Sequence, residues 1–200
     1  MESYKGENSE MNDTENTGQF ENDKKKKKKY SWMIEGICYI LIFLICVFIV
    51  PRYVAQRTVV EGSSMRDTLY NKDSLIVEKV SYRFNNPNRY DIVTLDPHDD
   101  EAEYYVKRVI GLPGETIQVK EGLVYINGEL LEGEHYGKEI IMDPGIAKDA
   151  ITLGEDEYFV LGDNRNGSID SRELGPIKKE QIKGHAIFRI WPFERFGTLD

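Results

Sequence analysis

Cysteine is scarce in this 200-residue chain, which contains only Cys38 and Cys46. Both lie in one uncharged stretch, residues 36–51, so the rest of the chain has none. Outside that stretch, the absence excludes a disulfide framework, a thiolate metal site and a cysteine nucleophile. The stability of the remaining chain must therefore come from packing of its hydrophobic residues, which make up 40% of the sequence.

Net positive charge and histidine are also lacking. The formal net charge is −9 at pH 7, which argues against a nucleic-acid binder, because such proteins normally present a basic face to phosphate. The three histidines are His98, His135 and His185, and none lies in a recognisable motif, so a Ser–His–Asp triad has no support. His98 lies in an acidic loop, which is either a weak metal site or simply solvated.

The uncharged run is the most prominent feature that is present. Tyr30 and Trp32 precede residues 36–51, and Tyr53 follows them. About 20 apolar residues suffice to span a bilayer as a helix, and aromatic residues favour its interfaces. We therefore predict a transmembrane anchor over residues 30–52. A cleavable signal peptide is the alternative, but no small-x-small cleavage site follows the run.

Six consecutive lysines, residues 24–29, precede this anchor. Basic residues next to a span remain on the cytoplasmic side. Residues 1–29 are therefore expected to form a disordered cytoplasmic tail, and residues 53–200 an extracytoplasmic domain.

Beyond Arg57 no window is long enough for a convincing amphipathic helix. Short β-branched or aromatic runs alternate with turn residues, which predicts a mainly β domain. Residues 128–154 are expected to form a peripheral excursion, and one turn after Ser64 is the only helical candidate outside the anchor. The expected strands are residues 58–61, 74–79, 92–95, 104–110, 116–120, 123–126, 158–161 and 185–191.

Three polar segments could carry chemistry, and the first is residues 60–69. Here a strand ends in a tight turn, Gly62-Ser63-Ser64. Such a turn exposes hydroxyl groups, and Gly62 lets another backbone approach closely, which suits a nucleophile for acyl transfer. The alternative is that Ser63 or Ser64 only caps free backbone N–H groups.

The second segment, residues 105–115, contains a lysine between apolar neighbours. Strand alternation places Tyr105, Lys107 and Val109 on one face. Lys107 is then either a solvent-facing charge on an edge strand or a desolvated amine that can act as a neutral base.

The third segment, residues 162–172, is a polar loop after an expected strand. A calcium loop is disfavoured, because Arg165 stands where a ligand oxygen is needed. No single segment is decisive, so the interpretation depends on their combination and order.

In this order behind an N-terminal anchor, the segments resemble the bacterial type I signal peptidases of the small, single-span Gram-positive kind. The resemblance covers most of residues 58–190 and implies an N-terminal transmembrane helix followed by a β-rich, LexA-like catalytic domain. It is carried by Gly62-x-Ser64-Met65-x-x-Thr68-Leu69, Arg89-Tyr90-Asp91-Ile92-Val93, residues 105–115, residues 162–172, Gly175-Pro176 and Gly184-x-Ala186.

What the resemblance implies is a membrane-bound serine endopeptidase that removes N-terminal signal peptides from secreted precursors. Its partners would be preproteins with small residues near the cleavage site and the lipid bilayer, with no nucleic acid. No metal or cofactor is implied. The enzyme would be a single-pass protein of the cell membrane with its C-terminal domain outside.

The resemblance also implies residue roles. Ser64 would attack the scissile carbonyl, and Lys107, kept neutral by burial, would act as the base. Ser168 resembles the family's serine that orients this lysine. Gly62 stands where some members have a helper serine, so backbone N–H groups would supply most of the oxyanion stabilisation. The residues that resemble the family's structural ion pairs are Asp163, Arg165, Asp170 and Arg172.

One position departs from the family pattern. Asp67 stands three residues after Ser64, where proline is nearly invariant, and it either loosens the turn or caps the next one. This leaves open a catalytically impaired paralogue that binds exported chains. A self-cleaving LexA-type repressor is disfavoured, because the chain offers no DNA-binding helical domain. We also expect Met65 and Leu69 to be exposed and to rest on lipid.

Overall fold

The computed structural model describes residues 31–97 and 104–199. The tail with its lysine run, and His98 in its acidic loop, lie outside the described residues. The chain divides into two units, Met1–Ile49 and Val50–Asp200.

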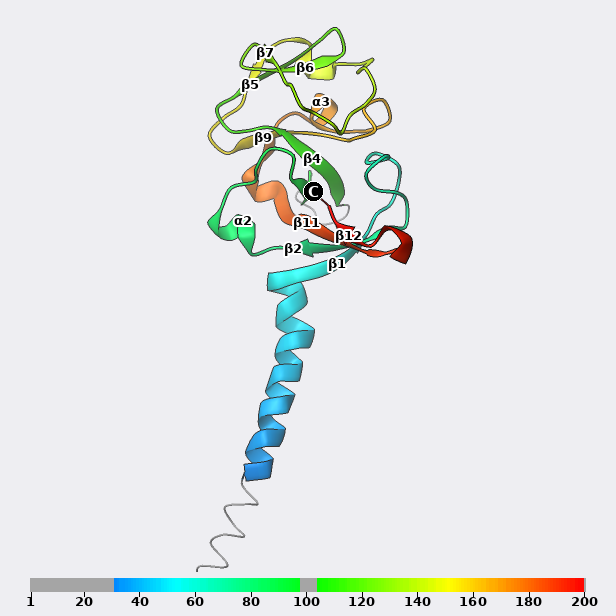
Figure 1. The fold of residues 1–200 in the computed structure, drawn as a ribbon. Coiled ribbons are helices and arrows are strands. Elements are labelled where there is room, and N and C mark those ends of the chain that lie inside the picture. The colour runs from blue at the N-terminus through cyan, green and yellow to red at the C-terminus, as the bar shows by residue number, and fades with distance from the viewer. Residues whose placement is uncertain (1–30, 98–103, 200) are drawn as a thin grey trace, which may run out of the picture. The chain divides into compact units, whose positions relative to one another are not determined.

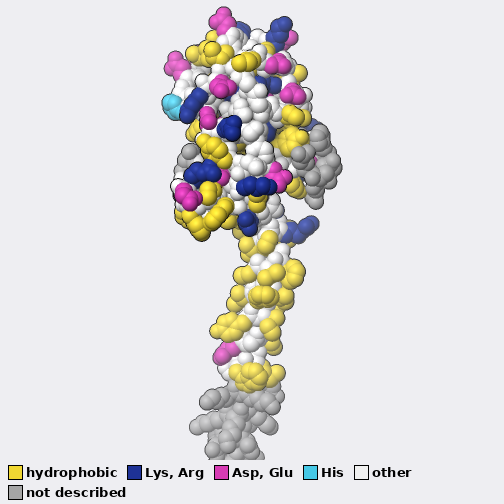
Figure 2. All heavy atoms as spheres, turned by 90° about the vertical axis from the view of Figure 1, so that its right-hand side faces the viewer, with side chains coloured by type: hydrophobic (Ala, Val, Ile, Leu, Met, Phe, Trp, Pro, Cys, Tyr) yellow, Lys and Arg dark blue, Asp and Glu magenta, His cyan; other side chains and the backbone are white. Residues whose placement is uncertain are grey.

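An apolar helix covers Ser31–Val54, and its last part, η1 (Ile45–Val54), is wound as a π-helix. Its 24 residues would extend about 36 Å at the usual helical rise, enough for a hydrocarbon layer of ~30 Å. Hydrophobic side chains cover the face shown in Figure 2. In the described part of the chain, this is the one helix that meets the length and composition of a membrane span.

Residues after the helix form an antiparallel β domain built on two sheets (Figure 1). The larger sheet has the order β1-β2-β11-β3-β4-β9-β10, with β12 paired to β11. Its strands are β1 (Ala55–Val59), β2 (Ser74–Glu78), β3 (Ile92–Leu95), β4 (Tyr105–Gly111), β9 (Glu157–Leu161), β10 (Ile177–Lys178), β11 (Ile182–Trp191) and β12 (Gly197–Thr198). The prediction of an N-terminal apolar helix followed by a mainly β domain is confirmed.

The smaller sheet has the order β7-β6-β5-β8. Its strands are β5 (Thr116–Lys120), β6 (Leu123–Ile126), β7 (Glu129–Leu130) and β8 (Ile151–Thr152). Residues 128–154 thus contribute two short strands to it, together with a long connection that contains η2 (Gly145–Lys148).

Short helices occur where the sequence did not suggest them. These are α2 (Ser81–Phe84) and α3 (Ser171–Leu174), together with the 3₁₀ turns η3 (Lys179–Gln181) and η4 (Phe193–Arg195). Carboxylates stabilise both α-helices, because Glu78 accepts hydrogen bonds from the first N–H groups of α2, and Asp170 accepts one at the start of α3. The expectation of a single helical turn outside the anchor was therefore wrong.

Strand β4 is central to the domain, because it is buried on both faces from Lys107 to Gly111. Val109 packs into the core of the larger sheet, whereas Ile110 belongs to the core beneath the smaller one. A separate core cluster, which includes Leu75 and Val77 of β2, packs under the segment after β1. The fold therefore places β4 where polar side chains are withdrawn from water.

Candidate active site

Ser64 lies in a hydrogen-bonded turn between β1 and β2. Within this turn, the N–H of Arg66 donates to the Ser63 carbonyl at 3.0 Å, and the N–H of Leu69 donates to the Met65 carbonyl at 2.7 Å. Gly62 has a φ of +90°, a backbone conformation that L side chains rarely adopt. The turn is therefore fixed by its own backbone and exposes the serine at its start.

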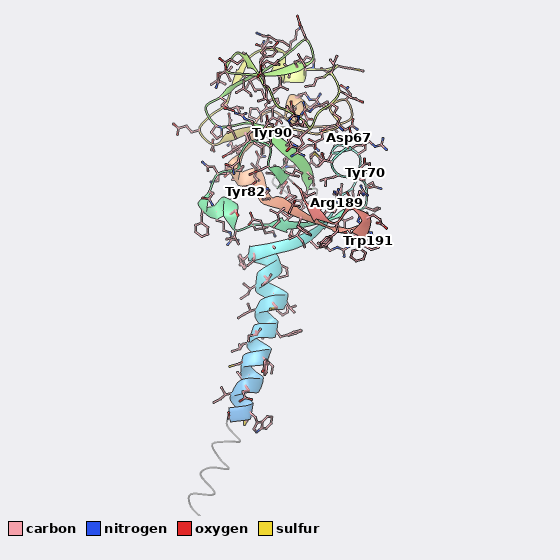
Figure 3. All side chains as sticks on the ribbon, in the orientation of Figure 1. Asp67, Tyr70, Tyr82, Tyr90, Arg189 and Trp191 are labelled. Atoms are coloured by element: carbon pink, nitrogen blue, oxygen red, sulfur yellow. The ribbon has the colours of Figure 1, made fainter. Side chains whose placement is uncertain are left out.

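Met65 and Leu69 secure this turn from below. Both side chains are buried, at 1% and 0% exposure, in the core cluster under β2. The prediction that they form an exposed apolar surface for lipid was wrong, because their four-residue spacing directs both into the core. The exposed large side chains of the β domain include Val59 and Ile169 near Ser64, and Trp191, which Figure 3 labels.

Lys107 of β4 meets Ser64 directly. Its Nζ lies 2.9 Å from Ser64 Oγ and 3.2 Å from the Val106 carbonyl, to which it also donates. Burial lowers the pKa of Lys107 to about 8, although the negative charge of Asp170 opposes this shift. At neutral pH, about one amine in ten is then uncharged, far more than for a solvated lysine. Of the two interpretations of Lys107, the structure supports the desolvated amine.

Both residues open into a groove of about 490 Å³. One wall follows residues 58–65, and the other follows residues 104–107 at the start of β4. Gly167 and Ile169 also line it. β4 pairs with β3 from Tyr105, but with β9 only from Arg108, so residues 105–107 present one edge without a strand partner in the described chain.

Ser168 lies in the loop behind the pair. Its Oγ is buried and has no hydrogen-bond partner among the described residues, so the expected bond to Lys107 is not formed in this state. Gly162 creates the space for it, because a Cβ at that position would overlap both Ser168 Oγ and the Ser64 carbonyl oxygen. The loop is held against the turn that carries Ser64 by the N–H of Asn164, which donates to the Ser64 carbonyl at 3.0 Å.

Gly162→Ala is expected to lower kcat by about tenfold, because the added methyl must displace Ser168 or the Ser64 backbone. Steady-state kinetics on the kind of substrate that the sequence resemblance implies would measure the loss. Gly154→Ala is the matched control, since a Cβ there meets only the flexible Glu157 side chain. Equal activity of both variants would contradict the close packing inferred at Gly162.

All four charged residues predicted in the loop form ion pairs, but only one pair lies within the predicted set. Asp170 binds Arg172 through two hydrogen bonds of 2.9 Å, and it also accepts the N–H of Gly162 at 3.0 Å. Arg165 instead pairs with Glu134, and burial lowers its pKa to about 10.

Asp163 pairs with Arg108, which the sequence analysis did not select. The guanidinium binds the carboxylate at 2.8 and 2.9 Å, while Thr68 Oγ1 donates to the same carboxylate at 2.5 Å. Arg108 is only 1% exposed. Its position beside Lys107 in a buried strand was the signal in the sequence that could have identified it.

Within the described residues, the histidines and acidic residues form no alternative centre. His185 stacks on Tyr82, with its Nε2 3.8 Å from Asp91, and neither His185 nor His135 lines the groove. Within residues 31–97 and 104–199, no three His, Cys, Asp or Glu side chains are grouped so that they could hold a metal.

Asp67 has a φ of +85° in the turn that carries Ser64. Its side chain is exposed, and its carboxylate has no partner among the described residues, so it does not cap the next turn. Figure 3 labels it with Tyr70 on the loop between β1 and β2. Proline fixes φ near −65°, so the proline that is typical of the resembled family cannot adopt this backbone conformation.

Comparison with known proteins adds a consistent result. Residues 33–191 match the family described as signal peptidase, peptidase S26. A signal peptidase I of Leptolyngbya laminosa is 40% identical over 86% of this chain and 86% of that protein. A probable signal peptidase I-2 of Synechocystis sp. is 37% identical, covering 90% and 83%. A signal peptidase I P of Bacillus subtilis subsp. natto is 39% identical, covering 86% and 96%.

Proposed function

Because the chain belongs to the signal peptidase family, peptidase S26, and has the signal-peptide-cleaving activity of signal peptidase I, we propose that Ser64 is its nucleophile and Lys107 its general base. The observation that carries this assignment is the 2.9 Å separation between Lys107 Nζ and Ser64 Oγ in the groove. Neutral Lys107 can accept the hydroxyl proton at this distance, and its lowered pKa makes the neutral form accessible.

The reaction then proceeds in two halves. Ser64 Oγ forms a bond to the scissile carbonyl carbon while its proton passes to Lys107 Nζ. The peptide C–N bond breaks as Lys107 returns the proton to the leaving amine. Water then attacks the carbonyl carbon of the acyl-enzyme and gives a proton to Lys107. As the bond to Ser64 Oγ breaks, Lys107 returns that proton to the Ser64 oxygen.

We propose that the backbone N–H of Ser64 donates a hydrogen bond to the oxyanion. This N–H donates no hydrogen bond within the described chain, whereas the N–H of Gly62 is occupied by Asn71 Oδ1 at 3.2 Å. Gly62 therefore supports the turn through its backbone conformation rather than as a donor. A backbone donor aimed at the developing charge is worth several kcal/mol in such reactions, about 3 on average.

Ser168 is proposed to support the lysine at a later stage. Once Ser64 Oγ is acylated, it is a poorer hydrogen-bond acceptor for Lys107. The buried hydroxyl of Ser168, which has no partner among the described residues, can then accept an N–H from the amine and keep it in place.

Preprotein substrates are proposed to bind extended in the groove. The unpaired edge of residues 105–107 can add a peptide strand by backbone hydrogen bonding, and β1 at the edge of its sheet forms the opposite wall. Small side chains next to the cleavage site would fit between the two walls. We further propose that the N-terminus is cytoplasmic and that the β domain is outside, because the lysine run precedes the span.

The pH dependence of cleavage tests the role of Lys107. Since the neutral amine is the active form and its pKa is about 8, kcat/KM should rise nearly tenfold per pH unit below that pH and level off above it. The measurement uses a precursor without titratable side chains beside the cleavage site. A flat profile between about pH 6 and 9 would show that a different group is the base.

A further inference from the structure

Residues 134–137 lie in the connection between β7 and η2, and none of them lines the groove with Ser64 and Lys107. They nevertheless contact two buried arginines, Arg108 and Arg165. Apart from Tyr90, the other partners of these arginines belong to the segments that carry Ser64 and Ser168. Through these two arginines, the long connection of the smaller sheet is linked to the active site.

Tyr136 covers the first arginine. The Cζ atom of Arg108 lies 3.5 Å from the centroid of the Tyr136 ring, and the Tyr90 ring packs beside it at 5.5 Å. Arg108 also donates to the Tyr90 carbonyl at 2.7 Å and to Thr68 Oγ1 at 3.4 Å. Tyr90, which Figure 3 labels, lies beside β4, because its N–H donates to the Val109 carbonyl at 2.8 Å. Since Thr68 belongs to the nucleophile turn, Arg108 links that turn to the ring of Tyr136.

Glu134 binds the second arginine. Both terminal nitrogens of Arg165 donate to the Glu134 carboxylate, one of them at 3.3 Å, while Nε donates to the Gly162 carbonyl at 3.1 Å. A Cβ on Gly137 would overlap the same guanidinium, so only glycine allows the segment to pack this closely. Gly162 in turn lies against Ser168 Oγ and the Ser64 carbonyl. Arg165 therefore links Glu134 to the loop behind the nucleophile.

We propose that this segment positions the catalytic groups through two of its residues, Tyr136, which acts through Arg108, and Glu134, which acts through Arg165. The segment holds the turn of Ser64 and the loop of Ser168 in register with each other. Ion pairs are stronger where water is excluded, and a covered guanidinium cannot change its partners. This inference rests on the roles proposed for Ser64 and Lys107.

Tyr136→Ala in the full chain, solubilised in detergent, should lower kcat about tenfold with KM unchanged, because the groove itself is intact. Tyr136→Phe should retain the native kcat, since the aromatic face covers Arg108 without the hydroxyl. Glu134→Gln should also lower kcat, because an amide is a weaker partner for Arg165. His135→Ala is the matched control on the same segment, as His135 is exposed, and it should change nothing.

All variants are assayed well below their own thermal unfolding midpoints. A Tyr136→Ala kcat within about twofold of native would overturn the inference. A rise in KM alone would also overturn it, by placing the segment in substrate binding, and so would failure of Tyr136→Phe to retain activity. Ser64→Ala in the same assay tests the proposed function separately, because continued cleavage by that variant contradicts the dyad whatever Tyr136 does.

Discussion

Replacing Ser64 by alanine, or Lys107 by methionine, is expected to lower the rate of precursor cleavage by about 10³-fold or more. Alanine removes the hydroxyl oxygen, which lies 2.9 Å from Lys107 Nζ. Methionine keeps most of the length and burial of the lysine side chain, but it cannot accept a proton. The measurement is the yield of mature protein, cut at the signal junction, from detergent-solubilised full chain at matched concentration.

Matched controls exist for both substitutions. Ser31→Ala changes an exposed serine at the start of the apolar helix, which does not line the groove, and Lys120→Met changes an exposed lysine at the end of β5. Both controls should cleave like the native chain. Substantial cleavage by either dyad variant would mean that the short Ser64–Lys107 contact is structural and that another group attacks the substrate.

Asp67→Pro is expected to reduce cleavage by about 100-fold, although proline is the residue that the family resemblance suggests there. The φ of Asp67 is +85°, whereas a proline ring holds φ near −65°. The turn must then be rebuilt, which moves Ser64 relative to Lys107. Kinetic assays with a precursor, together with the thermal unfolding midpoint, would separate displacement of the serine from loss of the fold.

Asp67→Gly and Asp67→Asn are the informative companions to this variant. Both residues adopt a left-handed backbone more readily than most, so activity should remain near native. Glycine should also raise the free energy of unfolding slightly, by about 1 kcal/mol, because it relieves the conformational strain. If Asp67→Pro proved more active than the native chain, the turn would have to adopt a different backbone during catalysis.

Parts of the fold could be read from the sequence because they are encoded locally. Strands β3, β5 and β6 begin and end where the apolar runs predicted, since turn residues bound each run. The two-residue strands β7, β8, β10 and β12 could not be found, because two residues have no periodicity and pair only through their neighbours. Strand β1 begins three residues earlier than expected, because pairing with β2 continues to Ala55.

The candidate site could also be predicted only in part from the sequence. The resemblance to a known family indicated Ser64, Lys107 and Ser168, and their assigned roles remain proposals. The supporting partners were not indicated, because Arg108 meets an aspartate 55 residues away and Arg165 meets a glutamate 31 residues away. Such pairs depend on how strands are ordered in the sheets, which local patterns do not specify.

The unpaired edge of residues 105–107 has a consequence for the exported proteins themselves. Three strand residues extend only about 10 Å, so the proposed strand addition would hold only a short stretch of each precursor. Backbone groups are the same in every peptide, so binding through them would depend little on the sequence of the signal peptide. If precursors bind as proposed, their signal peptides can differ widely in sequence, provided that the few residues beside the cut are small enough to enter the groove. One protease of this kind would then accept many different precursors.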